Sequence, residues 1–479
     1  MRYKKALLIY PPVGHYQRGE ERCQADIESG SAINIREPLD LAVIGAILAD
    51  AGMRPVIRDY PAENKGWKHF TNDLKDEKPD IVLISITEAT LKEDLYALEL
   101  AKKSNSNILT LAKGAVFSTY NDALLSKIDF SSLDIAFCGE AEFILKELLL
   151  SFENKMELSK VKGIAYKNNE RICFTPKREF DKDLDSLPYP RRDLIINSLY
   201  IRPDSGQPQA TIQASRGCPF KCIYCLSPIF SGCKVRTRSI KNILGEIEEC
   251  INKYNIRNFF FRADTFTYNK KHVTELCRQI IESSLNINWV ANSRVDTFDI
   301  ETASWMKKSG CWLVAFGIES GNQEILDKIK KNTDNEKAEK AIEICKKTGL
   351  KTYGFFMIGF PWDNRDTIED TIDLATRLEL DFIEIHISTP YAGTELYDIA
   401  TKLGLVDSPP SGYNYFSNPP AGTLYLSRQE LIELRKKGLK RFYLSNKYIR
   451  KKIFSTRSPK EIINYLRYGL KLIKNLMRK

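Results

Sequence analysis

The chain of 479 residues lacks any uncharged apolar run of about 18 residues, so the sequence predicts no membrane-spanning helix. Its first apolar run, Ala6 to Tyr10, is too short for a signal-peptide core and reads better as a buried strand. The 11 cysteines are odd in number and scattered, which excludes a disulfide framework of the secreted type. These absences favour a protein of the reducing cytoplasm.

Acidic residues are nearly absent from the end of the sequence. Residues 435–479 hold 16 lysines and arginines but one acid, Glu461, although the whole chain has a net charge of only +10. Apolar and basic residues recur at helical spacing over 459–479, which predicts a basic amphipathic helix. Such a helix suits peripheral contact with an anionic membrane, and it equally suits docking on the protein with a solvated basic face. No nucleic-acid-binding motif accompanies the charge, so we expect no nucleic-acid partner.

Hydrophobic patterning predicts an α/β protein whose residues 1–152 form a Rossmann-like, doubly wound parallel sheet. The expected strands are 5–10, 55–60, 80–86, 108–113 and 134–138, and the expected helices are 39–51, 67–76, 91–103 and 142–152. Residues 153–208 are predicted to be a hairpin around Asn168-Asn169 followed by an extended linker at 187–192, because proline disfavours helix before it.

The alternation of strand and helix restarts at residue 209 and continues to 390. Six strands are too few for the usual eight-stranded barrel, so we predict a partial (β/α)6 barrel. Residues 391–479 are predicted to be an irregular segment, most of it within 389–422, and a basic helical tail. The expected barrel strands are 210–214, 258–262, 289–293, 312–318, 352–358 and 382–388; the expected helices are 240–253, 271–283, 300–308, 336–348, 366–378, 426–454 and 458–479.

Three cysteines with the spacing C-x3-C-x2-C follow the first barrel strand, where barrel active sites lie: Cys218, Cys222 and Cys225. Three thiolates facing one point can bind a four-iron cluster and leave one iron open for a ligand that is not protein, whereas ferredoxin-type clusters close with a fourth cysteine. Two alternatives are a zinc site with Cys233 as fourth ligand and three ordinary buried cysteines.

The run from Arg216 to Cys225 resembles the signature of the radical S-adenosylmethionine enzymes. Pro38-Leu39-Asp40-Leu41, residues 46–52 and Cys138-Gly139-Glu140-Ala141-Glu142 resemble the cobalamin-binding domain fused to many of them. The resemblance implies a [4Fe–4S] cluster on the three cysteines, S-adenosylmethionine on the open iron, and cobalamin. It also implies cleavage of the sulfonium to a 5′-deoxyadenosyl radical, with electrons from an external donor such as flavodoxin or ferredoxin.

By this resemblance, S-adenosylmethionine contacts residues at the carboxyl ends of the barrel strands. Tyr224 is expected near the adenine and Asp264 near the amine. Arg294 is expected to pair with the carboxylate of S-adenosylmethionine or with Glu319. Glu319 and Ser320 suit hydrogen bonds to the ribose or the amine.

The candidate cobalamin contacts are Ser85, Thr87 and Gly114, at the ends of strands in the first sheet. The Asp-x-His-x-x-Gly cobalamin motif is absent, so His15 is not expected to bind cobalt. An alternative is a Rossmann-like domain that has lost its cofactor.

The function favoured by the resemblance is methylation of an unactivated carbon of a hydrophobic substrate, such as a lipid, an isoprenoid or a tetrapyrrole. Alternatives are oxidative cyclisation of the anaerobic porphyrin-cyclase type, carbon–carbon bond formation on lipids, and a non-catalytic iron–sulfur sensor. A methylthiotransferase is disfavoured because the amino-terminal domain has only Cys23 and Cys138.

Overall fold

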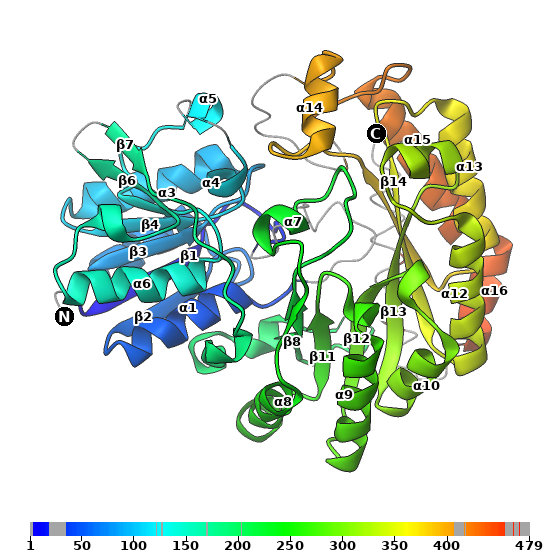
Figure 1. Cartoon of the computed structure of the whole chain (residues 1–479), viewed down its shortest axis with the longest axis horizontal. Coiled ribbons are helices and arrows are strands. Elements are labelled where there is room, and N and C mark those ends of the chain that lie inside the picture. The colour runs from blue at the N-terminus through cyan, green and yellow to red at the C-terminus, as the bar shows by residue number, and fades with distance from the viewer. Residues whose placement is uncertain are drawn as a thin grey trace.

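The computed structural model describes residues 3–18, 35–120, 122–125, 128–168, 171–202, 204–406, 416, 418–455, 463 and 469. It consists of two α/β parts that lie side by side, an amino-terminal part in blue to cyan and a barrel part in green to yellow (Figure 1). The helix predicted over 458–479 falls outside the described residues, apart from two single positions.

Within the described residues, the amino-terminal part has one sheet of seven strands. Its strands are β1 (Lys5–Tyr10), β2 (Arg54–Asp59), β3 (Ile81–Ser85), β4 (Leu109–Lys113), β5 (Ile135–Phe137), β6 (Ile164–Asn168) and β7 (Arg171–Phe174). Their order is β2-β1-β3-β4-β5-β6-β7. The first five are parallel, and the antiparallel hairpin β6–β7 extends the sheet.

Helices cover both faces of this sheet, as the sequence predicts. Leu7 and Ile9 of β1 pack on one face, and Ala6 and Leu8 pack on the other, because successive strand residues point to opposite sides. Both faces are therefore buried, which is typical of doubly wound sheets. The helices are α1 (Leu39–Asp50), α2 (Trp67–Glu77), α3 (Leu91–Ser104), α4 (Val116–Thr119), α5 (Asp122–Leu125) and α6 (Ala141–Glu153).

In the described part of the second half, six parallel strands follow one another in chain order across the sheet, which confirms the partial barrel. The strands are β8 (Gln209–Gln213), β11 (Asn258–Arg262), β12 (Asn288–Arg294), β13 (Cys311–Glu319), β14 (Lys351–Ile358) and β15 (Phe382–Ile387). A two-stranded ribbon, β9 (Ser215–Arg216) with β10 (Arg236–Thr237), stands beside β8.

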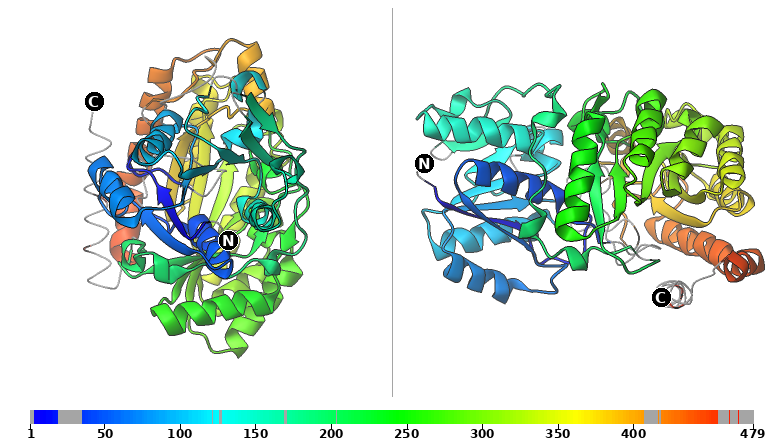
Figure 2. Two further views of the ribbon diagram at one scale, coloured as in Figure 1. Left: turned by 90° about the vertical axis from the view of Figure 1, so that its left-hand side faces the viewer. Right: turned by 90° about the horizontal axis from the view of Figure 1, so that it is seen from below.

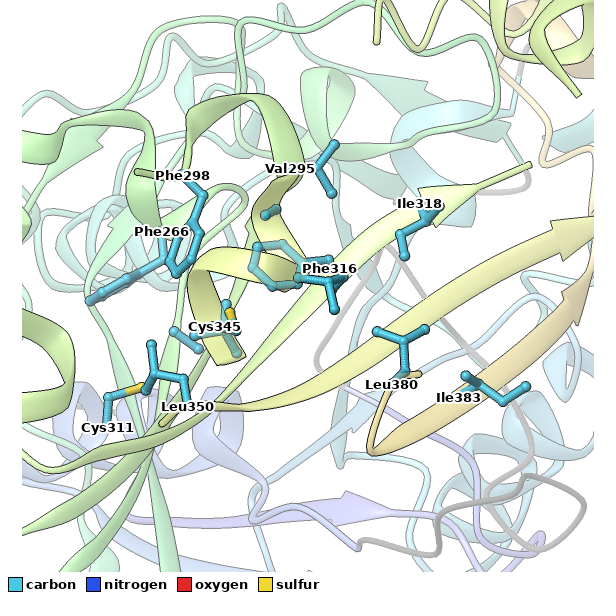
Figure 3. Packing of buried hydrophobic residues seen from close by; sticks show 14 of the residues in the cluster. Phe266, Val295, Phe298, Cys311, Phe316, Ile318, Cys345, Leu350, Leu380 and Ile383 are labelled. Carbon is cyan, nitrogen blue, oxygen red and sulfur yellow. The ribbon is translucent and has the colours of Figure 1, made fainter. Parts of the chain in front are cut away.

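Helices cover the outer face of the barrel sheet. They are α8 (Ile240–Tyr254), α9 (Lys270–Glu282), α10 (Ile300–Lys308), α12 (Asn335–Thr348), α13 (Arg365–Arg377), α15 (Arg428–Tyr443) and α16 (Asn446–Ser455). Three short helices, α7 (Ser227–Phe230), α11 (Gln323–Lys328) and α14 (Glu395–Lys402), pack instead near the cysteine loop and the first sheet. Figure 3 shows part of the resulting core. The rings of Phe298 and Phe316 pack edge to face there, with 5.1 Å between their centroids. Helices α15 and α16, orange to red, lie along the outer side of the barrel (Figure 2).

The sequence prediction fails in one described segment of the carboxy-terminal region. Residues 389–422 were expected to be irregular, yet α14 lies within them, because Thr394 caps the helix by accepting a hydrogen bond from the Tyr397 amide. The described stretches contain no helix of the length and apolarity that a membrane crossing requires.

The segment that joins the two parts is packed rather than extended into solvent. Arg192 is 1% exposed and pairs with Glu37, which precedes α1, and with Glu246 of α8. Its Nη2 also donates to the carbonyl of Thr211 in β8 over 2.7 Å. One buried guanidinium thus connects both parts of the molecule. The domain limits given from the sequence stay a prediction.

The carboxyl ends of the two sheets face each other across an apolar contact. Ala89 and Ala115 follow β3 and β4, and they form one buried cluster with Leu226, Phe230 and Tyr391 from the barrel side. In Figure 1, α7 lies between the two parts. Because ligands of open α/β sheets bind at the carboxyl ends of the strands, both expected binding edges meet here.

Candidate functional site

The cysteine loop begins directly after β9 and depends on Gly217. This glycine has a φ of +100°, and a Cβ there would lie 2.1 Å from the carbonyl oxygen of Lys234. Its amide donates to Oδ2 of Asp264 over 2.7 Å, and the Cys218 amide donates to the carbonyl of Gly232. The loop is therefore fixed by backbone contacts that a side chain at position 217 would break.

Each of the three sulfur atoms has a polar neighbour. Sγ of Cys218 lies 4.0 Å from the Thr265 hydroxyl, Sγ of Cys225 accepts from the Ser227 amide at 3.4 Å, and Sγ of Cys222 accepts from Arg294 at 3.8 Å. Hydrogen bonds of this kind stabilise thiolate ligands.

The donor set fits an iron–sulfur cluster better than a single ion. Among the residues with described positions, no three His, Cys, Asp or Glu side chains converge as ligands of one metal ion. A zinc ion needs such convergence, and Cys233, the predicted fourth ligand, is exposed. In a [4Fe–4S] cluster each cysteine binds a different iron, so its sulfur atoms stand further apart. The arrangement therefore does not support the zinc alternative.

Burial keeps two of the thiols protonated in the free loop. It raises the pKa of Cys225 to about 11, and it also raises the pKa of Cys218. Because the thiolate is the ligand, binding of iron must release these protons.

The structure places Asp264 behind the loop and Tyr224 at its far end. Asp264 holds the Gly217 amide, which gives its carboxylate a structural contact in addition to its predicted one with the amine. Tyr224 packs against Phe360 at 5.8 Å between ring centroids, and its hydroxyl lies 3.5 Å from Nζ of Lys331. Burial, followed by the negative charge of Glu319, raises the pKa of Tyr224 well above its ordinary value, so it stays a neutral donor.

Glu319 ends β13 in an unusual backbone conformation. Its φ is +71°, next to a register irregularity between β13 and β14, and such strain in a residue with a side chain is concentrated at functional sites. Its carboxylate pairs with Lys331 at 2.7 Å, and both side chains are less than a tenth exposed. Sequence reasoning missed Lys331, which lies just beyond α11 in a lysine-rich stretch that carries no motif.

Arg294 and Ser320 are both engaged with protein groups. Arg294 pairs with Asp296 through Nε and Nη2, at 2.9 and 2.8 Å, so its expected alternative pairing with Glu319 is wrong. Burial opposes the charge of Arg294, but Asp296 outweighs it and raises the pKa of the guanidinium. The Ser320 hydroxyl lies 3.2 Å from that of Thr371 in α13, in the helix layer. The roles of Tyr224, Asp264, Arg294, Glu319 and Ser320 toward S-adenosylmethionine stay predictions.

The three candidate cobalamin contacts lie together at the carboxyl edge of β3 and β4. The Ser85 carbonyl accepts from Arg18, and the Thr87 amide donates to Asp94, which forms a buried ion pair with Arg18. Gly114 has a φ of +159°, and a Cβ there would lie 2.6 Å from the Ile86 carbonyl. Gly114 is therefore required for the close approach of this turn to the Ile86 backbone, and Ser85 and Thr87 are buried beside it.

His15 lies near the end of β1, and its expected lack of a bond to cobalt stays a prediction. Its Nε2 lies 2.9 Å from the carbonyl oxygen of Pro61, so the ring has a partner within the protein. The roles of Ser85, Thr87 and Gly114 toward cobalamin stay predictions.

A cluster of ion pairs joins the start of α6 to the cysteine loop. Glu140 binds Arg216 at 3.0 Å and Arg236 at 2.8 Å, and Glu142 binds Arg216 at 2.9 Å. Arg216 directly precedes Gly217, so these ion pairs attach the amino-terminal part to the loop next to its first cysteine. A cavity of about 110 Å³ lies beside this cluster and reaches Lys113 and Asp264. Arg216, Glu140 and Glu142 belong to the motifs cited from the sequence and Arg236 does not, and no local pattern predicts their contact.

Fold and site together define a two-part enzyme scaffold, in which a three-cysteine loop at a barrel mouth faces the edge of a second sheet. Comparison with known families agrees: residues 212–375 match the radical SAM superfamily, and residues 31–149 match the B12 binding domain.

Similar proteins span most of the chain. An uncharacterized methyltransferase of Pyrococcus horikoshii is 32% identical over 418 residues, which cover 87% of this chain and 90% of the relative. An anaerobic magnesium-protoporphyrin IX monomethyl ester cyclase of Rubrivivax gelatinosus is 26% identical over 79% of this chain and 70% of its own length. The chain belongs to the radical SAM superfamily, among the members that carry a B12 binding domain.

Two solved structures share the fold. The cobalamin-dependent S-adenosylmethionine radical enzyme OxsB has a TM-score of 0.72 at 14% identity, covering 99% of this chain and 72% of its own. The radical S-adenosylmethionine methyltransferase TsrM of Kitasatospora setae has a TM-score of 0.65 at 18% identity, covering 85% and 78%.

As a family member, the protein is an enzyme of the cobalamin-dependent radical S-adenosylmethionine methyltransferase class. Its cofactors are a [4Fe–4S] cluster, S-adenosylmethionine and cobalamin. The alternative of a non-catalytic sensor is thereby set aside.

Proposed function

We propose that the enzyme transfers a methyl group to an unactivated carbon of a hydrophobic small molecule, such as a lipid, an isoprenoid or a tetrapyrrole. When bound, the cluster passes an electron from a flavodoxin- or ferredoxin-type donor to S-adenosylmethionine, which yields the hydrogen-abstracting radical, and cobalamin supplies the methyl group. The residues of the chain hold the carboxyl edges of the two sheets together, so that the substrate binds between the two cofactors.

The observation that carries the proposal is the apolar contact between the two carboxyl edges. Leu226 and Phe230 follow the cysteine loop directly, and they pack on Ala89 and Ala115 at the edge predicted to bind cobalamin. Methyl transfer to a substrate radical requires the corrin close to the barrel mouth, and this packing supports such an approach.

The inner face of the barrel supports a hydrophobic substrate. Tyr353, Phe355 and Met357 alternate along β14 with residues buried under the helices, so they line the inside and are half-buried. Phe355 contacts His386 of β15 at 5.9 Å between ring centroids. Burial lowers the pKa of His386, so its imidazole is neutral at pH 7. This wall offers aromatic surface with two neutral polar groups, the Tyr353 hydroxyl and the His386 imidazole.

Product analysis tests the proposal. Anaerobically purified protein with quantified iron and corrinoid, incubated with reductant, S-adenosylmethionine and candidate lipids or tetrapyrroles, should release 5′-deoxyadenosine and S-adenosylhomocysteine. Cys222→Ala should abolish release of 5′-deoxyadenosine, whereas the exposed Cys233→Ala should retain it. Purified protein that contains iron but takes up no corrinoid would rule out methyl transfer from cobalamin.

A second candidate function is oxidative cyclisation. The similarity to the magnesium-protoporphyrin cyclase of Rubrivivax gelatinosus favours it, since that protein matches most of this chain. Release of 5′-deoxyadenosine without S-adenosylhomocysteine in the same assay would select cyclisation over methylation.

We also propose peripheral membrane contact through the basic tail, on the basis of the charge of residues 459–479, because upstream basic residues such as Arg435 and Lys437 pair with acids of the barrel. The full chain should bind anionic vesicles at low salt and neutral vesicles much less. The double substitution Lys471→Glu/Lys474→Glu should weaken binding to anionic vesicles by at least about thirtyfold, since the two lost cations contribute about 1 kcal/mol each and the new acids add repulsion. Equal flotation of this variant and the wild type would refute the contact.

A further inference from the structure

The guanidinium of Arg294 lies against the cysteine loop on two sides. Its Nη1 donates to Sγ of Cys222 over 3.8 Å, and its Cζ lies 3.7 Å from the ring centroid of Phe220, which belongs to the same loop. The residue is 6% exposed, so its positive charge acts where water screens it little.

The other donors of Arg294 have protein partners that fix its orientation. Nε and Nη2 bind the two carboxylate oxygens of Asp296, and Nη2 also donates to the carbonyl of Lys331 over 2.7 Å. A two-point pair with a carboxylate holds the guanidinium plane in place. Nε and Nη2 are therefore occupied, and Nη1 is the group that faces the cluster ligand.

A cation in this position favours the reduced cluster. Reduction adds one negative charge to the cluster, and a fixed positive charge nearby stabilises that state more than the oxidised one. Hydrogen bonds to the sulfur ligands act in the same direction, and both are known determinants of iron–sulfur potentials.

We propose that Arg294 is a positioning residue of the cluster, which holds the Cys222 thiolate and raises the reduction potential of the cluster, instead of binding the carboxylate of S-adenosylmethionine. The inference assumes the bound cluster and the electron donor of the proposed function, but it does not depend on which substrate is methylated. One electron enters from the flavodoxin- or ferredoxin-type donor and leaves to the sulfonium, so no further reductant is required.

The test is a potentiometric titration of the full-length, cluster-loaded protein, followed by the electron paramagnetic resonance signal of the reduced cluster. In Arg294→Gln, the ratio of reduced to oxidised cluster at a fixed potential should fall about tenfold, which is a shift of about 59 mV to more negative values for one electron. Asp296→Asn removes the negative charge that partly offsets the guanidinium, so the same electrostatic argument predicts a midpoint shift to more positive values. Affinity for S-adenosylmethionine should change less than twofold in Arg294→Gln.

Arg278→Gln is the matched control. Arg278 also forms a two-point pair with one carboxylate, that of Glu275, and it contacts Glu282 as well. It lies on the exposed face of α9, so its loss should leave the midpoint unchanged. A wild-type midpoint in Arg294→Gln with full iron content would overturn the inference, as would a large loss of S-adenosylmethionine affinity without a midpoint shift.

If Arg294→Gln does not retain iron, Arg294→Met and Asp296→Asn decide the question, because each changes the net charge of the Arg294–Asp296 pair. Wild-type midpoints in both would refute the inference. A shifted midpoint in a protein that methylates nothing would contradict the proposed function and leave this inference standing.

Discussion

Gly217→Ala is expected to abolish cluster binding while most of the fold survives. The new Cβ would lie 2.1 Å from the carbonyl oxygen of Lys234, a backbone atom that cannot turn aside, so the turn before Cys218 must open. Opening the turn also removes the bond from the Gly217 amide to Asp264. Iron content and the visible absorbance of the reconstituted protein should fall to the level of Cys222→Ala, with loss of 5′-deoxyadenosine release.

Gly206→Ala separates this clash from backbone strain. Gly206 also has a positive φ, of +69°, but a Cβ there meets no atom within 4 Å. It should cost about 1–2 kcal/mol of stability and leave iron content unchanged. If Gly217→Ala binds iron as well as Gly206→Ala does, the rigid loop described above is not required for the cluster.

Much of the fold could be predicted because buried parallel strands leave continuous apolar runs. The runs at 5–10, 258–262 and 382–388 became β1, β11 and β15 with ends within one residue. The prediction failed where an element is short or lacks a hydrophobic period. The ribbon β9–β10 has two residues in each strand, and the eight-residue α14 lies in a stretch rich in proline and glycine.

The candidate site likewise contains residues that the sequence predicts and contacts that it does not. Cys218, Cys222 and Cys225 are close in sequence, so their spacing alone indicates a metal site. Lys331 comes to Glu319 only because the chain after α11 folds back over the loop, and Glu140 meets Arg216 across 76 residues. The first contact depends on how a loop folds within the barrel and the second on how the two parts pack, and no local pattern indicates either.

Glu140→Gln is expected to loosen the junction between the amino-terminal part and the cysteine loop. Glu140 receives hydrogen bonds from both Arg216 and Arg236, and its side chain is 7% exposed. Removing its charge leaves two buried guanidinium groups with only Glu142 as a nearby carboxylate, at a cost of about 3 kcal/mol. Chemical denaturation should show this loss, and hydrogen exchange should become faster in β9, β10 and the first turn of α6.

Glu147→Gln is the matched control because Glu147 lies on the same helix and also pairs with an arginine, Arg178. That pair is exposed by 24% and 35%, so its loss should cost less than about 1 kcal/mol and leave exchange in the ribbon unchanged. Equal stability of the two variants would show that the buried pairs do not hold the parts together. In that case the apolar contact of Leu226 and Phe230 with the first sheet would have to position the cysteine loop alone.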